Sequence, residues 1–102
     1  MKEIKAIIQP FMLTRVLEGL REVEGLPAVT VSEVRGYSVV DPDYEPRVKT
    51  KLEVMVPDTL VEPVVEVIQR HAHTGRRGDG RIFVIAIDQT VKIRTGERDT
   101  AT

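Results

Sequence analysis

The chain has 102 residues, which is enough for one domain with a modest core and too short for two. Its formal net charge is −1 with 30% charged residues, and this balance argues against a nucleic-acid-binding module with a net basic face. The absence of cysteine excludes disulfides, thiolate nucleophiles and thiolate metal sites. No apolar run is long enough to cross a bilayer and no signal-peptide pattern is present, so we expect a soluble cytoplasmic protein.

The first half of the chain contains two predicted strands and one predicted helix. Residues 3–9 alternate between apolar and charged side chains, which predicts a half-buried strand. Apolar residues recur at helical spacing over residues 11–23, which predicts an amphipathic helix. The β-branched segment 28–36 is typical of a strand, and residues 37–47, with two prolines and no clean period, are typical of a loop.

The second half repeats this arrangement. Residues 48–56 alternate, with the even-numbered side chains expected on one face and the odd-numbered ones on the other. Thr59 and Glu62 fit a capping box at the start of a second amphipathic helix. The wholly apolar segment 82–87 predicts a strand that is covered on both faces. Residues 89–94 predict a short final strand, and the tail beyond it is expected to be mobile at its end.

The predicted elements follow the order β-α-β-β-α-β, with a short extra strand at the C-terminus. This order is typical of an α+β, ferredoxin-like fold, in which both helices cover one face of an antiparallel sheet. No helix remains for the other face, and a short chain rich in β-branched residues often gains stability by assembling. We therefore expect one domain over residues 1–102 whose open sheet face is covered by other subunits.

Two basic segments flank the last long strand. The segment TGRRGDGR, residues 74–81, combines three glycines with three arginines. Glycines let the backbone turn through positive φ and approach a ligand closely, and arginine forks match phosphate oxygens. The segment KIRTGERD, residues 92–99, follows the strand. A solvated turn and a charged tail are the plain alternatives, but together the two segments indicate two walls of one anion site.

The chain resembles the PII signal-transduction family almost from end to end. The matching segments, in chain order, are MKEIKAIIQPF at the N-terminus, TVSEVRG at 30–36, KLEVMVPD at 51–58, TGRRGDGRIFV at 74–84 and KIRTGERD at 92–99. This resemblance implies a homotrimeric regulatory protein, and no enzyme. Such a protein binds ADP, ATP or AMP in clefts between subunits and signals to a partner protein by ordering a loop and the C-terminal tail. No catalytic set such as Ser/His/Asp is recognisable.

The resemblance also assigns candidate nucleotide-binding residues. Residues 74–81 correspond to the family's phosphate-holding loop, the B-loop, in which Arg81 replaces the usual lysine. Lys92 and Arg94 match a basic pair that reaches the phosphates from the neighbouring subunit. The B-loop residues implied as contacts are Thr74, Gly75, Arg76, Arg77, Gly78, Asp79, Gly80 and Arg81.

Four further candidates precede the B-loop in the chain. Gly36 matches a glycine at the base of a loop beside the nucleotide. Lys49 matches a lysine directed at the terminal phosphate, although a solvated lysine explains its position equally well. Glu53 and Met55 match positions that line the adenine or lie near it.

The main departure from the family is the loop at residues 37–48, the T-loop, which is much shorter than the resemblance leads us to expect. The glutamine that helps bind Mg-ATP with 2-oxoglutarate has no match, and Val39 and Val40 are the nearest residues. Tyr44 lies in a context unrelated to that of the family's modified tyrosine. We therefore do not expect 2-oxoglutarate sensing or uridylylation, whereas Mg²⁺ stays compatible with a bound nucleotide.

Other ligands and partners remain open. PII-like relatives with altered loops include members associated with carboxysomes or bicarbonate transport, in which bicarbonate would bind beside AMP or ADP. Others are linked to heavy-metal efflux, with a membrane transporter as the partner. A further alternative is a metal-responsive trimer like the CutA proteins, without a nucleotide, and the intact B-loop argues against it.

Two histidines invite a metal-binding interpretation. His71 and His73 carry imidazoles, which are common metal ligands, but two residues apart on a helix they point in different directions. The acidic residues Asp41, Asp43 and Glu45 form a second conceivable cation site. Solvated side chains are the simpler interpretation of both clusters.

Overall fold

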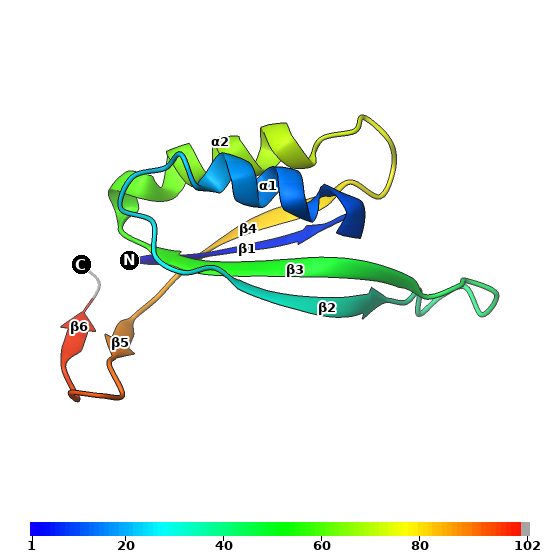
Figure 1. Ribbon diagram of the computed structural model, residues 1–102. Helices are drawn as coiled ribbons and strands as arrows, with labels where there is room; N and C mark the ends of the chain where they lie inside the picture. Colours follow the sequence, from blue (N-terminus) through cyan, green and yellow to red (C-terminus); the bar gives the residue numbers. More distant parts are fainter. Residues whose placement is uncertain (101–102) are drawn as a thin grey trace.

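The computed structural model describes residues 1–100 as two layers, a sheet and a pair of helices (Figure 1). The sheet has the strand order β2-β3-β1-β4, and all neighbouring strands are antiparallel. Its strands are β1 (Lys2–Ile8), β2 (Thr30–Gly36), β3 (Arg47–Val56) and β4 (Gly80–Ala86). The α+β, ferredoxin-like fold predicted from the sequence is confirmed.

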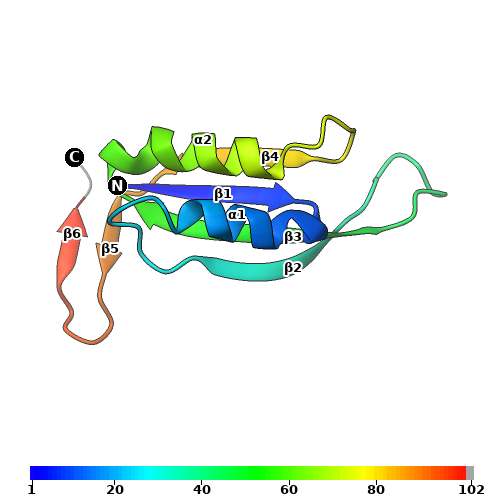
Figure 2. The same ribbon diagram turned by 45° about the horizontal axis from the view of Figure 1, so that its top comes forward.

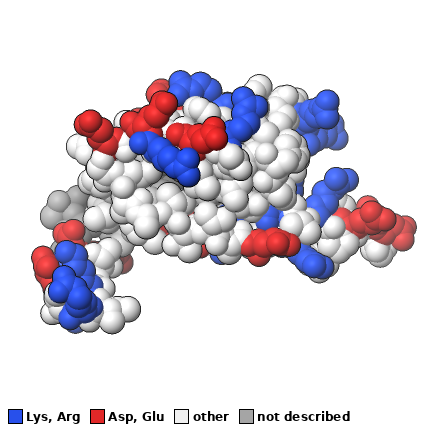
Figure 3. Space-filling view, in the orientation of Figure 1, with Lys and Arg blue, Asp and Glu red and all other residues white. Residues whose placement is uncertain are grey.

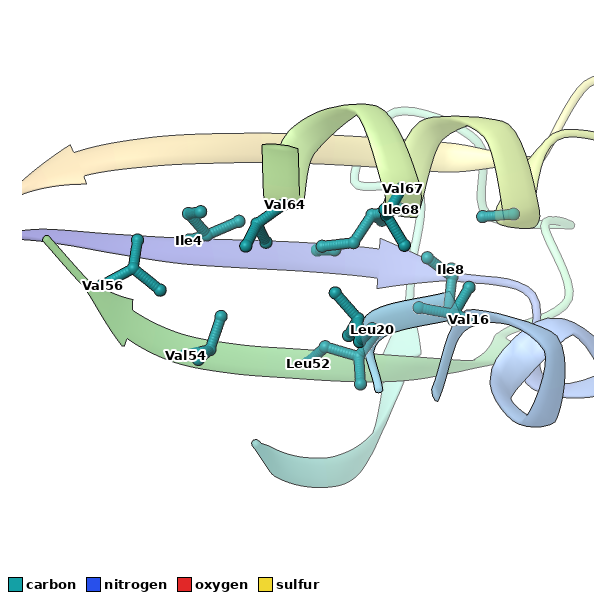
Figure 4. Close-up of a cluster of buried hydrophobic side chains, with 12 residues drawn as sticks. Ile4, Ile8, Val16, Leu20, Leu52, Val54, Val56, Val64, Val67 and Ile68 are labelled. Atoms are coloured by element: carbon teal, nitrogen blue, oxygen red, sulfur yellow. The ribbon is translucent and has the colours of Figure 1, made fainter. Parts of the chain in front are cut away.

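Both helices lie on the same face of the sheet, as predicted (Figures 1 and 2). α1 (Leu13–Leu20) follows one 3-10 turn, η1 (Pro10–Met12), and α2 (Val61–Ala72) follows another, η2 (Asp58–Leu60). Their apolar sides pack on the inward-facing residues of β1 and β3, where the even-numbered residues alternate as expected. The core between the layers consists of Ile4, Ala6, Ile8, Val16, Leu20, Leu52, Val54, Val56, Val64, Val67, Ile68 and Ala72 (Figure 4). No helix within residues 1–100 is long and apolar enough to span a bilayer.

The capping box expected at Thr59 and Glu62 is wrong. Thr59 lies inside η2, and neither this turn nor α2 has a side-chain cap. The chain enters α2 through a 3-10 turn, so Thr59 is already wound into the turn that it was expected to cap. The nearby carboxylate of Asp58 points elsewhere and accepts a hydrogen bond from the Lys2 ammonium at 3.1 Å, which ties the start of α2 to the start of β1.

β4 is an edge strand, and its apolar side chains are exposed in the single chain. The prediction that both faces of this strand are covered is therefore wrong for one chain, because Phe83 and Val84 keep 42% and 47% of their surface exposed. Within the described residues, no second layer covers the sheet face opposite the helices (Figure 1). A strand that another subunit covers has the same apolar pattern as a strand that its own chain covers.

The C-terminal segment forms a hairpin of its own. It consists of β5 (Gln89–Val91) and β6 (Arg98–Thr100), and it lies at the end of β4 farthest from the B-loop (Figure 1). The predicted strand at residues 89–94 is thus too long, because the chain turns after β5 and Lys92 N–H donates to the Glu97 carbonyl at 2.9 Å. The expected mobility concerns the end of the tail, residues 101–102, which lie outside the described residues.

Gly80 marks the close approach of β4 to β1. Its φ is +101°, and a Cβ added here would lie 1.7 Å from the Ile7 carbonyl oxygen. We expect Gly80→Ala to lower the free energy of unfolding by about 1–3 kcal/mol, because the methyl group displaces β4 from β1. Gly36→Ala is the matched control, since the nearest atom to its Cβ is the Arg47 carbonyl oxygen at 4.0 Å. Denaturant titration compares the two variants, and equal midpoints would contradict the expectation.

Candidate functional site

The shape of the B-loop depends on the carboxylate of Asp79. One oxygen accepts hydrogen bonds from the backbone N–H groups of Thr74 at 2.8 Å and Gly75 at 2.9 Å. The other oxygen accepts from the Thr74 hydroxyl group. The oxygen of this hydroxyl accepts in turn from the backbone N–H of Arg76 at 3.2 Å. The first half of the loop is therefore closed around an acid that points inward.

These hydrogen bonds divide the amides of the loop into two groups. The N–H groups of Thr74, Gly75 and Arg76 have acceptors inside the loop. Those of Arg77 and Gly78 have no acceptor within residues 1–100, and Gly78 adopts a positive φ of +94°. Successive backbone N–H groups in such a turn form an anion-binding concavity. One half of the loop thus maintains its shape, and the other half can contact a ligand.

The pKa of Asp79 is lowered from the ordinary value of 3.8, because the hydroxyl and then the backbone N–H of Thr74 donate to the charged carboxylate. A lowered pKa means that this group stabilises the folded loop above the ordinary pKa and ceases to do so as the pH falls through the lowered value. Both oxygens of Asp79 are occupied by the loop itself. Asp79 therefore positions the other candidate residues of the B-loop.

Lys49 connects β3 to the B-loop. Its ammonium donates to the Gly78 carbonyl at 2.6 Å. The amide nitrogen of Gln9 also approaches Gly78, since a Cβ added there would lie 2.9 Å from it. The structure thus places Lys49 beside the glycine segment, where an anion on the B-loop would meet its charge. Gln9 was not predicted from the sequence, because nothing in the pattern of the first strand relates it to the B-loop.

A pocket of about 310 Å³ lies between the B-loop and the loop at residues 37–48. Three of its lining residues carry positive charge, and none carries a carboxylate. The lining residues are Gln9, Tyr44, Arg47, Lys49, Arg77 and Gly78. Sequence reasoning missed Arg47, which lies in the segment without a family match. Arg47 pairs with Gly36 in the register of β2 and β3. This pair lies at the base of the loop, which is where the resemblance implied that Gly36 would be.

The remaining candidates lie apart from the B-loop. Lys92 and Arg94 belong to the hairpin at the other end of β4, where the Lys92 ammonium lies 3.6 Å from the Glu97 carboxylate (Figure 1). Within a single chain the two basic segments therefore do not meet. A site that both form between neighbouring subunits, as the resemblance implies, stays a prediction. Glu53 and Met55 lie farther along β3 on the open sheet face, on the same side of the strand as Lys49.

The two histidines face different surroundings. His71 Nδ1 lies 2.8 Å from the Val67 carbonyl oxygen, and the ring is so close to Gly19 that a Cβ there would lie 2.8 Å from it. His71 is therefore part of the contact between α1 and α2. His73 follows the end of α2 and lies next to Gly75 in the B-loop. Across residues 1–100, no three side chains of the His, Cys, Asp and Glu types converge as metal ligands do.

Replacing Asp79 tests the account of the B-loop. In the wild type, we expect the amide NMR signals of Thr74 and Gly75 to titrate together with a midpoint below 3.8. Asp79→Asn retains one acceptor oxygen in place of two, so both amides should exchange faster with solvent at neutral pH. Asp88→Asn, at the far end of β4, is the control and should change neither signal. A midpoint at or above the ordinary aspartate value would contradict the account.

The family model described as nitrogen regulatory protein P-II matches residues 1–97. Nitrogen regulatory protein P-II of Azospirillum brasilense is 46% identical over 112 aligned positions, which cover 96% of each chain. Nitrogen regulatory protein P-II 1 of Escherichia coli K12 is 42% identical over 113 positions, which cover 99% of this chain and 98% of its own. Because these alignments exceed 102 residues, both relatives contain residues that this chain lacks. The chain belongs to the nitrogen regulatory protein P-II family.

Proposed function

We propose that this protein is a regulatory protein that binds adenine nucleotides, namely ADP, ATP or AMP, in the clefts between the subunits of a homotrimer. The observation that carries the proposal is the geometry of the B-loop. Asp79 closes its first half, the amides of Arg77 and Gly78 have no acceptor within residues 1–100, and the ammonium of Lys49 lies 2.6 Å from the Gly78 carbonyl oxygen. Backbone N–H groups and cations in this arrangement suit phosphate oxygens.

Two features of the single chain support the homotrimer. The first is the open sheet face with the exposed apolar side chains of β4, which a neighbouring subunit would bury. The second is the position of Lys92 and Arg94, which can approach only the B-loop of another chain. In a closed ring, each chain gives its B-loop to one site and its hairpin to the next, so that all sites are equivalent.

The Lys49–Gly78 contact supports a route from the nucleotide to a partner protein. A terminal phosphate would compete with the Gly78 carbonyl for the Lys49 ammonium, and ADP or AMP would leave that contact in place. Arg47 and Tyr44 line the same pocket, so the position of Lys49 would bias the loop that carries them. A nucleotide shifts this equilibrium only through such differential contacts. Mg²⁺ would accompany ATP, and the partner, such as a membrane transporter, would bind one state of the loop.

The pocket beside the B-loop favours a second, small anionic ligand. Arg47, Lys49 and Arg77 surround it without a carboxylate. We propose bicarbonate, bound beside ADP or AMP, as the ligand to test first. If the protein instead acts in metal efflux, its partner would be an efflux transporter, and the proposed nucleotide site would be the same. A CutA-like trimer without a nucleotide is a weaker alternative, because it provides no ligand for the anion-binding geometry of the B-loop.

Isothermal titration with ADP, ATP and AMP tests the nucleotide site. We expect at least one nucleotide to bind, and Arg81→Ala to weaken it about tenfold or more, because a charged donor to phosphate is lost. Arg21→Ala removes the same charge from the far end of α1 and should bind like the wild type. The proposal fails if none of the three nucleotides binds, or if Arg81→Ala matches the wild type.

Repeating the ADP and AMP titrations in bicarbonate tests the second ligand. Bicarbonate should tighten nucleotide binding to the wild type and have no effect on Arg47→Ala, which lacks one of the cations of the pocket. An unchanged affinity of the wild type in bicarbonate would eliminate this ligand and leave the nucleotide site in place.

A further inference from the structure

A second basic surface lies on the helix side of the B-loop. It is a groove of about 600 Å³ between the B-loop and the start of α1. Gln9 and Arg77 line both this groove and the pocket beside Lys49, so they form the wall between the two. Lys and Arg side chains gather at this end of the molecule (Figure 3). The groove is lined by Gln9, Phe11, Met12, Arg15, His73, Thr74, Arg76 and Arg77.

The groove combines an exposed aromatic ring with an arginine. Phe11 keeps 71% of its surface exposed, whereas the adjacent Met12 is buried and holds the turn against the core. Arg15 follows four residues later, a spacing that places it next to Phe11 on the same side of the helical segment. Aromatic residues and arginines are the residue types that contribute most at protein interfaces.

The charges of the groove have one sign. Arg15, Arg76 and Arg77 line it, and no carboxylate does. Within the described part of the chain, none of these three guanidinium groups is in an ion pair or donates a side-chain hydrogen bond. Arginines whose guanidinium groups have no such partner are suited to bidentate pairing with carboxylates.

We propose that this groove, the Phe11 groove, binds an acidic peptide segment of a partner protein. An apolar side chain of the segment packs on Phe11, and its carboxylates pair with Arg15 and Arg76. A protein segment fits better than a small molecule because the residues Phe11, Arg15, His73, Arg76 and Arg77 are exposed, whereas small-ligand sites enclose most of their ligand. The groove faces the helix side, so the trimer proposed above, which covers the opposite sheet face, leaves it accessible.

The position of the groove gives it a means of regulation, and this part rests on the proposed nucleotide binding. Thr74, Arg76 and Arg77 of the B-loop form one wall of the groove, and Gly78 of the same loop accepts from Lys49 on the other side. A nucleotide that repositions the B-loop would therefore change the docking surface. This coupling does not require the loop at residues 37–48.

Peptide selection on the intact protein tests the Phe11 groove. Random displayed peptides are selected on the wild type, with counter-selection on Arg15→Glu. We expect enrichment of peptides that carry several Asp or Glu residues around one large apolar residue. A labelled peptide from this set should bind Arg15→Glu and Phe11→Ser about tenfold more weakly than the wild type, and Arg21→Glu equally well. Its affinity should fall as salt increases.

Two results would contradict the proposed peptide binding. Selected peptides without acidic enrichment, or equal binding to the wild type and Arg15→Glu, would overturn the proposal. Thermal unfolding verifies that each variant is folded, which is expected because all three altered side chains are exposed. ADP, ATP and AMP are titrated into the same proteins. A wild type that binds the peptide but no nucleotide would refute the proposed function and leave the groove assigned, and the reverse result would refute the groove alone.

Discussion

The pairing of β4 with β1 determines which segments of a single chain can come together in one site. The two strands pair along their whole length, from Lys2 opposite Ala86 to Ile8 opposite Gly80. At roughly 3.3 Å per residue, β4 separates the B-loop from the segment leading to the hairpin by about 20 Å. The pairing also keeps the strand extended, so its ends cannot fold toward each other. The two basic segments of the sequence therefore belong to different sites, or to one site shared between chains.

The same strand gives the B-loop two separate surfaces. Gly80 fixes where β4 begins, and Asp79 closes the loop just before that point. On one side, Gly78 meets Lys49 and the pocket next to the short loop; on the other, Arg76 lines the Phe11 groove. Both surfaces are basic, and they suit ligands of different size. In the coupling proposed above, a change in the B-loop would reach a partner without the long T-loop that the resemblance leads one to expect.

Local periodicity predicted most of the fold, and long-range contacts explain the errors. The alternation of residues 48–56 identified β3 and its buried face, because one side of that strand packs on helices of the same chain. The prediction that both faces of β4 are covered was wrong for one chain, because an apolar pattern does not distinguish a strand covered by its own chain from one covered by another chain. The B-loop was found from its composition. Gln9 and Arg47 were missed, because only the fold brings them to it.

The central claim is that the nucleotide site uses the B-loop of one chain and the hairpin of the next. ADP binding to mixed trimers tests it, with Arg81→Ala chains co-assembled with chains carrying Lys92→Ala and Arg94→Ala. Each variant alone should bind ADP weakly. In a ring, any trimer containing both chains has one site with both halves unaltered, so wild-type affinity should return in a fraction of the sites. Mixed trimers that bind no better than either parent would contradict the claim.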